Sequence, residues 1–444
     1  MRGIAIAIMV GFIFWGLSLT LFTMQHAVLI GLVAFLVTLW TNEAMPLGAV
    51  SILPIILFPT FGILDTNTVA SNYSKSIIFL FIGGFMLAIA IEKIGLHKYF
   101  SAKLLSFFPK TPRGIIYALA ITSALLSSIL MNTTITLMLM PVAMFLSDNI
   151  RLKVRFLLAV AYGASVGGTI TPIGTAPNLI LLGFLDDKGL DTLQFGEWIL
   201  FLLPAAFLML LIVPWILSIG VKAECVESVS DAIPELTKRQ RRLYSIVGLL
   251  AAVLVANTFT KQIFGFALNE RLVLLGFGLL MFVPKIGFLD WDDTRAMPYE
   301  IIFLFGAGFS IAAAVSSSGL ATEIAAMLSV ITTLPLFFML VVVALFVTFS
   351  TEITSNTALT SIAIPIFYEF AQDMPPNEGM LVLFVATIAA SYAFMLPIAT
   401  PPNAIVMSSR VIQIKEMATM GLKLNIIGVI VLSCVAYFIW KPFM

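Results

Sequence analysis

The amino-acid sequence predicts an all-α polytopic membrane protein with about 11 transmembrane helices, two re-entrant hairpins and an inverted-topology repeat. Three observations lead to this fold class. Apolar residues make up 60% of the 444 residues, charged residues make up only 11%, and the mean hydropathy is +1.09. Apolar runs long enough to cross a hydrocarbon layer of roughly 30 Å recur along the whole chain. Blocks of the first half also return about 224 residues later.

The apolar segments define the expected helices in chain order. They cover residues 3–23, 26–41, 47–64, 76–94, 154–185, 195–220, 243–260, 270–284, 300–318, 379–409 and 420–440. Two further segments, 112–147 and 331–368, are interpreted as re-entrant hairpins; two full crossings of each are the alternative, and hydropathy does not separate the two. The first segment is interpreted as a retained helix rather than a signal peptide, because no small-x-small cleavage site precedes His26.

The placement of basic residues predicts the orientation. With a cytoplasmic N-terminus and each hairpin returning to its own side, 19 of the 24 Lys and Arg residues face inward. The outward-facing residues are Lys75, Lys188, Lys261, Arg271 and Lys441. Cytoplasmic loops carry the excess of Lys and Arg in membrane proteins, so this partition supports the orientation. The loop "KRQRR" at 238–242 is the clearest cytoplasmic mark. We expect the protein in the inner (plasma) membrane of a bacterium.

Four blocks of the first half recur in the second. The pairs are "SIIFLFIGGFMLAIAIEKIGL" (76–96) with "EIIFLFGAGFSIAAAVSSSGL" (300–320), "FPTFGILD" (58–65) with "VPKIGFLD" (283–290), "MNTTITLMLMP" (131–141) with "SNTALTSIAIP" (355–365), and "TPIGTAPN" (171–178) with "LPIATPPN" (396–403). Chance readily aligns apolar residues, but it does not repeat polar and Pro residues in register over four blocks. The blocks therefore indicate an internal duplication.

The duplication predicts four parts. Residues 1–25 form a first transmembrane helix outside the repeat, 26–220 the first repeat, 221–242 a cytoplasmic linker and 243–444 the second repeat. Each repeat is expected to hold five spans, a hairpin and a broken helix. The hairpins are 112–147 and 331–368, and the broken helices are 154–185 and 379–409. An odd number of crossings makes the two copies run in opposite directions through the bilayer, which is typical of secondary transporters.

The recurring Pro-rich blocks predict breaks in two membrane helices. "TPIGTAPN" has two prolines and a glycine within eight residues, and "LPIATPPN" has three prolines. Because proline removes helical hydrogen bonds, each segment is expected to be two half-helices around an unwound turn. Irregular backbone inside a membrane is tolerated where it lines a site. The ends of the half-helices then offer amide N–H groups to an anion and carbonyl groups to a cation.

The hairpin tips are expected to face these turns. Each tip carries an Asn and a Thr, which are Asn132 and Thr133 in the first half and Asn356 and Thr357 in the second. A hydroxyl lies five residues before each Asn, at Ser127 and Thr351. No Arg, Lys or His lies in the four polar blocks, so an anion there would be held by amides, hydroxyls and helix N-termini. Hydroxyl, carbonyl and Asn oxygens are good ligands for Na⁺, and two related sets suggest two cation sites.

Other features exclude several function classes. The net charge of +1 gives no bulk electrostatic reason to expect a nucleic-acid partner. Cys225 and Cys434 match no metal-ligand spacing. No nucleophile with a nearby base, HExxH pair or paired midplane carboxylate is found, so an enzyme is not expected. Glu352 aligns with Ser128 of the first half, and it is either a functional intramembrane carboxylate or a structural or accessible one.

These motifs resemble the divalent-anion:sodium symporter family, whose INDY-type members carry di- and tricarboxylates. The similarity rests on "SNT" at 355–357 and "TPPN" at 400–403, together with "MNT" at 131–133 and "GTAPN" at 174–178, and the helix order matches over nearly the whole chain. The resemblance implies a homodimer in the lipid bilayer. In it, a rigid scaffold would hold an elevator-like transport domain made of the two hairpins and the two broken helices.

The resemblance also assigns site residues. One sodium site would use Ser127, Met131, Asn132 and the turn at Gly174, and the other would use Thr351, Ser355, Asn356 and the turn at Ala399. The substrate would meet Asn132, Thr133, Asn356 and Thr357, with Thr175, Thr400 and Pro401 nearby. The family has Ser where Met131 stands, so the first site loses a hydroxyl and keeps a backbone carbonyl. Ala176 replaces a second adjacent proline, which is a milder change.

The predicted function is sodium-coupled uptake of a small dianion by an elevator mechanism. A C4-dicarboxylate such as succinate, malate or fumarate is the expected substrate. A sodium-independent dicarboxylate exchanger and a sulfate carrier of the same family are the alternatives, and the hydroxyl missing at Met131 keeps weaker sodium dependence or exchange open. A passive channel would not need two broken helices.

Overall fold

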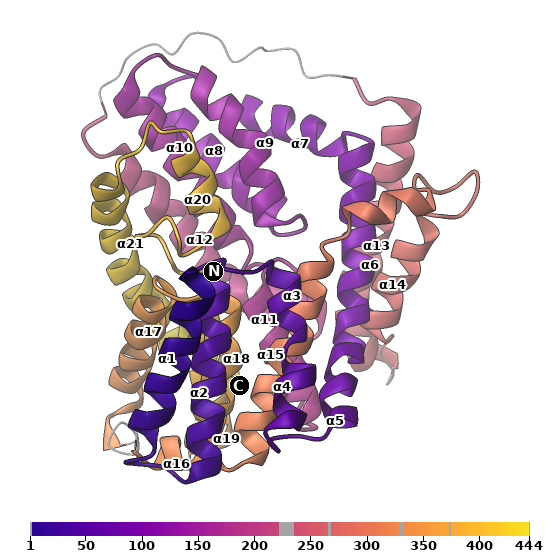
Figure 1. Ribbon diagram of the computed structural model, residues 1–444. Helices are drawn as coiled ribbons and strands as arrows, with labels where there is room; N and C mark the ends of the chain where they lie inside the picture. Colours follow the sequence, from indigo (N-terminus) through magenta and orange to yellow (C-terminus); the bar gives the residue numbers. More distant parts are fainter. Residues whose placement is uncertain (1, 222–234, 265–267, 328–332, 373, 444) are drawn as a thin grey trace.

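The computed structural model describes residues 2–221, 235–264, 268–327, 333–372 and 374–443. These residues form helices and loops and contain no β-strand (Figure 1). Five helical stretches among them are long and apolar enough to cross a membrane: Met24–Thr41, Thr66–Lys93, Phe195–Ser218, Tyr299–Ser317 and Ile414–Phe443. The predicted all-α membrane fold is thereby confirmed.

The first half contains twelve α-helices in the described residues. They are α1 (Arg2–Ser18), α2 (Met24–Thr41), α3 (Leu47–Ile52), α4 (Pro54–Thr60), α5 (Thr66–Ser71), α6 (Ser76–Lys93), α7 (Leu96–Ser106), α8 (Pro112–Ser127), α9 (Asn132–Phe145), α10 (Ile150–Gly167), α11 (Ala176–Asp187) and α12 (Phe195–Ser218). The segment expected as one helix at 47–64 consists of α3 and α4, which meet at Leu53. Pro54 begins α4, because its missing N–H costs least in the first turn.

The second half continues with nine α-helices in the described residues. They are α13 (Lys238–Phe264), α14 (Glu270–Leu280), α15 (Tyr299–Ser317), α16 (Leu320–Met327), α17 (Leu336–Thr351), α18 (Asn356–Ala371), α19 (Pro376–Ala389), α20 (Pro401–Ser408) and α21 (Ile414–Val435). A 3₁₀-helix, Trp291–Ala296, precedes α15, and a π-helical turn, Ala436–Trp440, follows α21.

Several predicted boundaries differ from the structure. Residues 238–242, expected in a cytoplasmic linker, form the first turn of α13, and residues 222–234 of that linker lie outside the described residues. The last helix begins at Ile414 rather than near 420, because Lys415 and Glu416 extend the first turn of α21 beyond the apolar run. Residues 331–332 of the second expected hairpin also lie outside the described residues.

Two pairs of helices, α8 with α9 and α17 with α18, form the segments that were expected to be hairpins. α8 and α9 have 16 and 14 residues, and α17 and α18 have 16 residues each. At 1.5 Å per residue, such helices are about 21–24 Å long, which is shorter than a hydrocarbon layer of roughly 30 Å. The turns between the paired helices bring the polar tips to the ends of α8 and α17.

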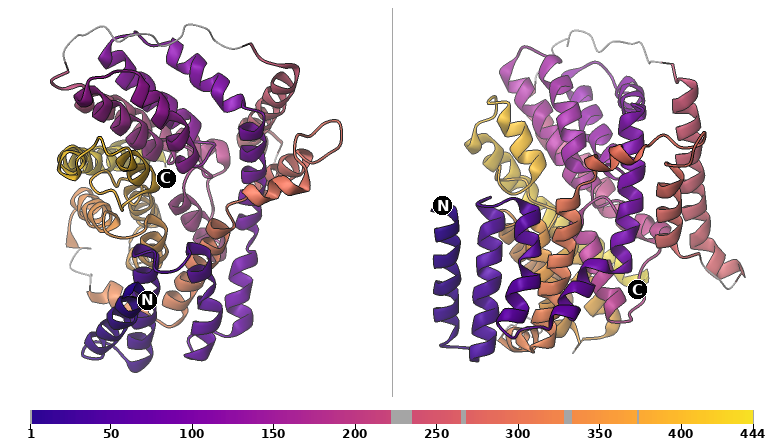
Figure 2. Two further views of the ribbon diagram at one scale, coloured as in Figure 1. Left: turned by 45° about the horizontal axis from the view of Figure 1, so that its top comes forward. Right: turned by 45° about the vertical axis from the view of Figure 1, so that its right-hand side comes forward.

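The helices of the two halves pack against one another. α8 contacts α10 and α12, and α17 contacts α19 and α21; α9 packs on α20, and α11 packs on α18. α1 and α2 lie side by side at one edge of the molecule, while α6, α13 and α14 lie toward the opposite edge (Figure 2). α15 runs between these groups and contacts both α3 and α18. This arrangement encloses the polar tips between the two edges.

The buried apolar residues form two clusters. The larger one joins α6–α14 with α17–α21 and includes Phe305 and Phe309 of α15. The smaller one joins α1–α5 with other residues of α15 and α16. Ala358 of α18 belongs to the smaller cluster, so α18 packs against both groups of helices. The site described next lies where these groups meet.

Candidate functional site

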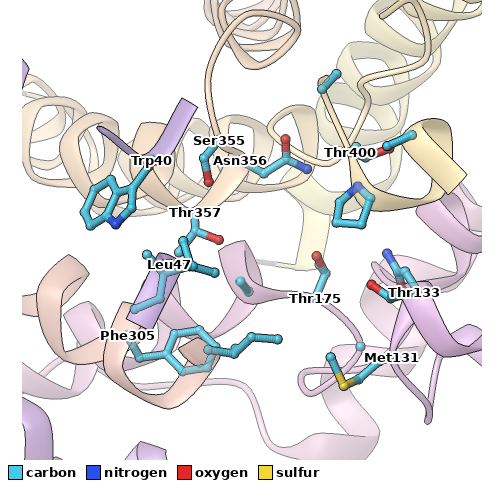
Figure 3. A pocket seen from close by; sticks show the side chains of 18 of the residues that line it. Trp40, Leu47, Met131, Thr133, Thr175, Phe305, Ser355, Asn356, Thr357 and Thr400 are labelled. Carbon is cyan, nitrogen blue, oxygen red and sulfur yellow. The ribbon is translucent and has the colours of Figure 1, made fainter. Parts of the chain in front are cut away.

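A cavity of about 790 Å³ lies where the two tips and the two Pro-rich turns meet (Figure 3). Eleven of the residues that the sequence singled out line it: Met131, Asn132, Thr133, Gly174, Thr175, Ser355, Asn356, Thr357, Ala399, Thr400 and Pro401. Ser127 and Thr351 do not line the wall, but each is fully buried directly behind it. All the predicted site residues therefore lie in or against one cavity.

The two tips repeat one hydrogen-bond pattern. The hydroxyl of Ser127 donates to Asn132 Oδ1, and the hydroxyl of Thr351 donates to Asn356 Oδ1 at 2.6 Å. Four residues after each Asn, a Thr hydroxyl donates to the carbonyl of that Asn at 2.7 Å, from Thr136 and Thr360. Each Asn side chain is thus held with its amide at the start of a helix.

The second tip is also joined to the broken helix behind it. The Thr351 hydroxyl lies 2.9 Å from the carbonyl oxygen of Ala390, which follows the end of α19. In the first half, the carbonyl of Ser128 accepts a hydrogen bond from the hydroxyl of Thr171, which lies in the unwound turn between α10 and α11. Each tip is therefore fastened to the unwound turn of its own half.

Neither Pro-rich segment is a continuous helix. α10 ends at Gly167 and α11 begins at Ala176, while α19 ends at Ala389 and α20 begins at Pro401. The Asn178 side-chain amide donates to the carbonyls of Gly168 and Thr171, at 3.1 and 2.9 Å. In the second half, Asn403 donates to the carbonyls ten and seven residues before it, both at 3.0 Å. These amides satisfy carbonyl groups that the break leaves without helical partners.

Close packing of backbone also shapes the first turn. A Cβ atom added at Gly174 would collide with the carbonyl oxygen of Gly168 and would lie 2.9 Å from its Cα. Only glycine fits such an approach. The turn places Gly174 and Thr175 on the cavity wall.

The electrostatics of the cavity come from neutral groups and helix ends. α9, α11, α18 and α20 all begin at or beside residues of the wall, so four helix N-termini surround it. Such termini present unpaired N–H groups and a partial positive charge, which favours anionic groups. Among the described residues that line the cavity, Glu43 is the one with a charged side chain, and it is exposed. An anion bound here would therefore meet N–H and hydroxyl donors rather than a basic side chain.

The oxygen ligands suit a hard monovalent cation. Asn132 and Asn356 bring side-chain carbonyls, Ser127 and Thr351 bring hydroxyls, and the turns bring backbone carbonyls within the same small regions. Such ligands match Na⁺ rather than a transition metal. Among the described residues, no group of three or more His, Cys, Asp or Glu side chains is placed to hold a metal ion.

One wall of the cavity was not anticipated from the sequence. Trp40, Leu47 and Phe305 lie on one side of the cavity, and Thr133, Thr175 and Thr400 lie on the other (Figure 3). Phe81 and Phe85 of α6 complete the apolar side. The repeated block at 76–96 and 300–320 carried the signal, because Phe81 and Phe305 occupy equivalent positions in it. Apolar residues in an apolar helix do not by themselves reveal a binding surface.

Comparison with known proteins identifies the group to which the chain is related. The family model described as citrate transporter matches residues 33–390. The sodium-dependent dicarboxylate transporter SdcS of Staphylococcus saprophyticus is 30% identical over 447 residues, which cover 92% of this chain and 85% of the relative. The sodium-dependent high-affinity dicarboxylate transporter 3 of Caenorhabditis elegans is 29% identical over 471 residues, which cover 91% of this chain and 82% of the relative.

Solved structures of membrane transporters share the fold. The YdaH transporter of Alcanivorax borkumensis superposes with a TM-score of 0.56 at 16% identity, over 85% of this chain and 91% of that chain. MtrF of Neisseria gonorrhoeae superposes with a TM-score of 0.57 at 13% identity, over 83% of each chain. At these identities the likeness concerns the fold alone.

The family match extends over most of the chain, and the alignments with both relatives cover more than nine tenths of it. The resemblance to divalent-anion:sodium symporters drawn from the tip and turn motifs is thereby confirmed. The chain therefore belongs to the citrate transporter family and is an integral membrane transporter rather than an enzyme.

Proposed function

We propose that this protein is a secondary active transporter that couples Na⁺ to the uptake of a small dianion, with a C4-dicarboxylate such as succinate, malate or fumarate as substrate. One observation carries the proposal. In each half, an Asn on the wall of one cavity (Asn132 or Asn356) accepts a hydrogen bond from a buried hydroxyl behind it (Ser127 or Thr351), beside an unwound turn. Relatives aligned over nearly the whole chain are named sodium-dependent dicarboxylate transporters, which agrees with this chemistry.

In this proposal, the cations and the anion use different faces of the same tips. The first Na⁺ would be bound by Ser127, Asn132, the backbone of Met131 and the turn at Gly174. The second Na⁺ would be bound by Thr351, Ser355, Asn356 and the turn at Ala399. The dianion would lie between them and accept hydrogen bonds from Asn132, Thr133, Asn356, Thr357, Thr175 and Thr400, next to Pro401. The two cations would offset the two negative charges of the substrate.

We also propose that the tips and broken helices move as one body. The short helices α8, α9, α17 and α18 pack with α10, α11, α19 and α20, and the packing pairs of the first half have counterparts in the second. This pattern supports the inverted repeat and an elevator-type movement of that body against α1–α6 and α13–α15. The similarity to divalent-anion:sodium symporters also implies that two copies form a homodimer. Light scattering of the purified protein tests this oligomeric state.

The orientation with a cytoplasmic N-terminus has support from ion pairs at one end of the molecule. Arg271 binds Asp186 through two N–H groups, at 2.7 and 2.9 Å, and Lys75 pairs with Asp187. Lys75 and Arg271 belong to the small set of basic residues expected outside. Both ion pairs lie at the end of α11, which agrees with Lys75 and Arg271 sharing one side of the membrane.

Sodium-independent exchange is the alternative that a specific observation favours. Met131 stands at the N-terminus of α9 without a side-chain hydrogen bond to the helix, and it offers a thioether where the family offers a hydroxyl. A weaker first site would reduce the sodium requirement. Sulfate is the alternative substrate, because neutral N–H and O–H donors can bind the oxygens of a sulfate as well as those of a dicarboxylate.

Reconstitution separates these possibilities. Purified protein in liposomes is given radiolabelled succinate with Na⁺, Li⁺ or K⁺ outside, and counterflow is measured in parallel without Na⁺. Sodium-coupled uptake predicts accumulation only under an inward Na⁺ gradient and competition by malate and fumarate. Counterflow that persists without Na⁺ identifies an exchanger, and competition by sulfate alone identifies a sulfate carrier. The proposal fails if neither uptake nor exchange of a dicarboxylate occurs.

A further inference from the structure

Glu352 follows Thr351 at the end of α17, and its carboxylate is buried. It is 3% exposed, and among the described residues it is the only Asp, Glu, Lys or Arg that is fully buried. Its Oε1 accepts hydrogen bonds from the Met395 backbone N–H at 2.8 Å and from the Asn425 side-chain amide at 2.7 Å. Its Oε2 accepts from the Leu396 backbone N–H at 2.9 Å. The carboxylate therefore meets N–H donors on both oxygens.

Asn425 of α21 extends this contact by one more residue. It is fully buried, and its Oδ1 accepts a hydrogen bond from the Phe394 backbone N–H at 3.3 Å. The pair of Glu352 and Asn425 thus accepts three successive backbone N–H groups, 394 to 396. These groups belong to the stretch between the end of α19 and the start of α20, where helical partners are missing. The same stretch leads to Ala399 and Thr400 on the cavity wall.

The first half fastens its turn differently. Ser128 is the residue equivalent to Glu352, and its hydroxyl donates to Leu125 O within its own helix. Its link to the first turn runs through its backbone carbonyl, which accepts from Thr171. The first turn is therefore held by a neutral contact, and the second is held by a carboxylate. The two halves differ in charge directly behind the tips.

We infer that Glu352 is a positioning residue for the second cation site, which it makes the tighter of the two. This inference rests on the proposed function, in which Na⁺ binds at Thr351 and Asn356. Glu352 holds the N–H groups of residues 395 and 396 directly and that of residue 394 through Asn425. It thereby keeps the turn at Ala399 in register with Thr351. Its negative charge also lies one residue from the Thr351 hydroxyl, in a buried region where charges act over longer distances than in water. The first site has neither contribution.

Sodium-dependent thermal stabilisation of the purified full-length protein tests this inference without any dicarboxylate. Na⁺ is titrated against choline at constant ionic strength, and the half-saturating concentration is read from the rise in melting temperature. Glu352→Gln is expected to raise that concentration at least tenfold, which corresponds to about 1.4 kcal/mol. The Gln NH₂ would face an N–H donor, and the charge would be lost. Glu352→Asp keeps the charge and is expected to lie closer to wild type.

Two control variants separate this effect from general damage. Ser128→Ala alters the equivalent position of the first half, whose side chain does not reach a turn, and is expected to leave the half-saturating concentration within twofold. Glu378→Gln makes the same chemical change in a carboxylate that binds Lys441, away from the cavity, and is also expected to have no effect on Na⁺ affinity. If Glu352→Gln does not fold, Asn425→Ala removes one donor and one acceptor of the same cluster, with an expected change of about threefold.

The outcomes distinguish this inference from the proposed function. Wild-type Na⁺ affinity in both Glu352→Gln and Asn425→Ala would overturn the positioning role. Equal loss in Glu352→Asp and Glu352→Gln would overturn the contribution of charge. If Na⁺ stabilises the wild type and Glu352→Gln weakens this effect, but liposomes show no sodium-driven uptake of dicarboxylate, the inference stands and the proposed function fails. If uptake is sodium-driven but Glu352→Gln leaves its sodium dependence unchanged, the inference fails alone.

Discussion

The rings of Phe81 and Phe305 stack against each other, with centroids 4.6 Å apart and an angle of 29° between their planes. The two residues occupy equivalent positions of the repeated block, 76–96 and 300–320, and both border the cavity. They are 4% and 1% exposed. The apolar wall thus depends on a contact between the two halves, whereas each polar tip is fastened mainly within its own half.

Phe305→Ala is expected to destabilise the protein by about 3 kcal/mol, because it removes a buried ring and leaves a cavity beside Phe81. The measurement is thermal unfolding of purified protein in detergent. Phe79→Ala on α6 is the matched control, because Phe79 is 43% exposed and its ring lies on the outer surface. A control variant as unstable as Phe305→Ala would show that the stack has no special contribution.

Met131→Ser is expected to raise the apparent affinity for Na⁺ about three- to tenfold, since it restores a hydroxyl to the first tip. The half-saturating Na⁺ concentration of succinate uptake in liposomes measures the effect. The reciprocal variant, Ser355→Met, removes the corresponding hydroxyl of the second tip and is expected to lower the affinity. No change in either variant would argue against assigning these residues to cation sites.

Asn178→Ala is expected to lower stability by about 1–3 kcal/mol, because it leaves the carbonyls of Gly168 and Thr171 without the amide that they accept from. Asn403→Ala is expected to have a similar effect in the second half. Thermal unfolding measures both, with Asn67→Ala, at an exposed position near the start of α5, as the control. Wild-type stability in both Asn178→Ala and Asn403→Ala would mean that water replaces the lost amides without cost.

Gly174→Ala is expected to reduce sodium-driven succinate uptake by tenfold or more, because the added methyl group collides with the Gly168 carbonyl and displaces the turn. Gly16→Ala on α1 is the matched control, since no atom lies within 4 Å of the Cβ that it would add. The control is expected to transport normally and to be slightly more stable, as alanine favours helix. Normal uptake by Gly174→Ala would show that the turn tolerates displacement.

Local signals in the sequence were sufficient to predict which polar residues meet. Asn132, Asn356 and the prolines of both turns stand out because they interrupt apolar segments, and their recurrence pairs them. Helix boundaries were harder to predict from the sequence. The short helices α5, α7 and α16 carry no long apolar run, and the basic residues at 238–242 form a helical turn although their charge suggested a loop.

Contacts between distant parts of the chain could not be read from the sequence. Trp40 and Leu47 border the cavity with Phe81 and Phe305, yet each is an ordinary apolar residue of a membrane helix. Likewise, the sequence left the role of Glu352 open, because its partner Asn425 lies 73 residues away on α21 and belongs to no recurring block. Such partners are chosen by packing in three dimensions rather than by local pattern.

The composition of the cavity wall has a consequence for leakage. Among the described residues that line it, no basic side chain balances the charge of a dianion. Carrying two uncompensated charges through the low-dielectric interior of a bilayer would cost on the order of tens of kcal/mol. An anion that entered without counter-ions would therefore return to the same side. Because no basic side chain is present here, the cost of removing the anion from water is itself a barrier against its crossing without counter-ions.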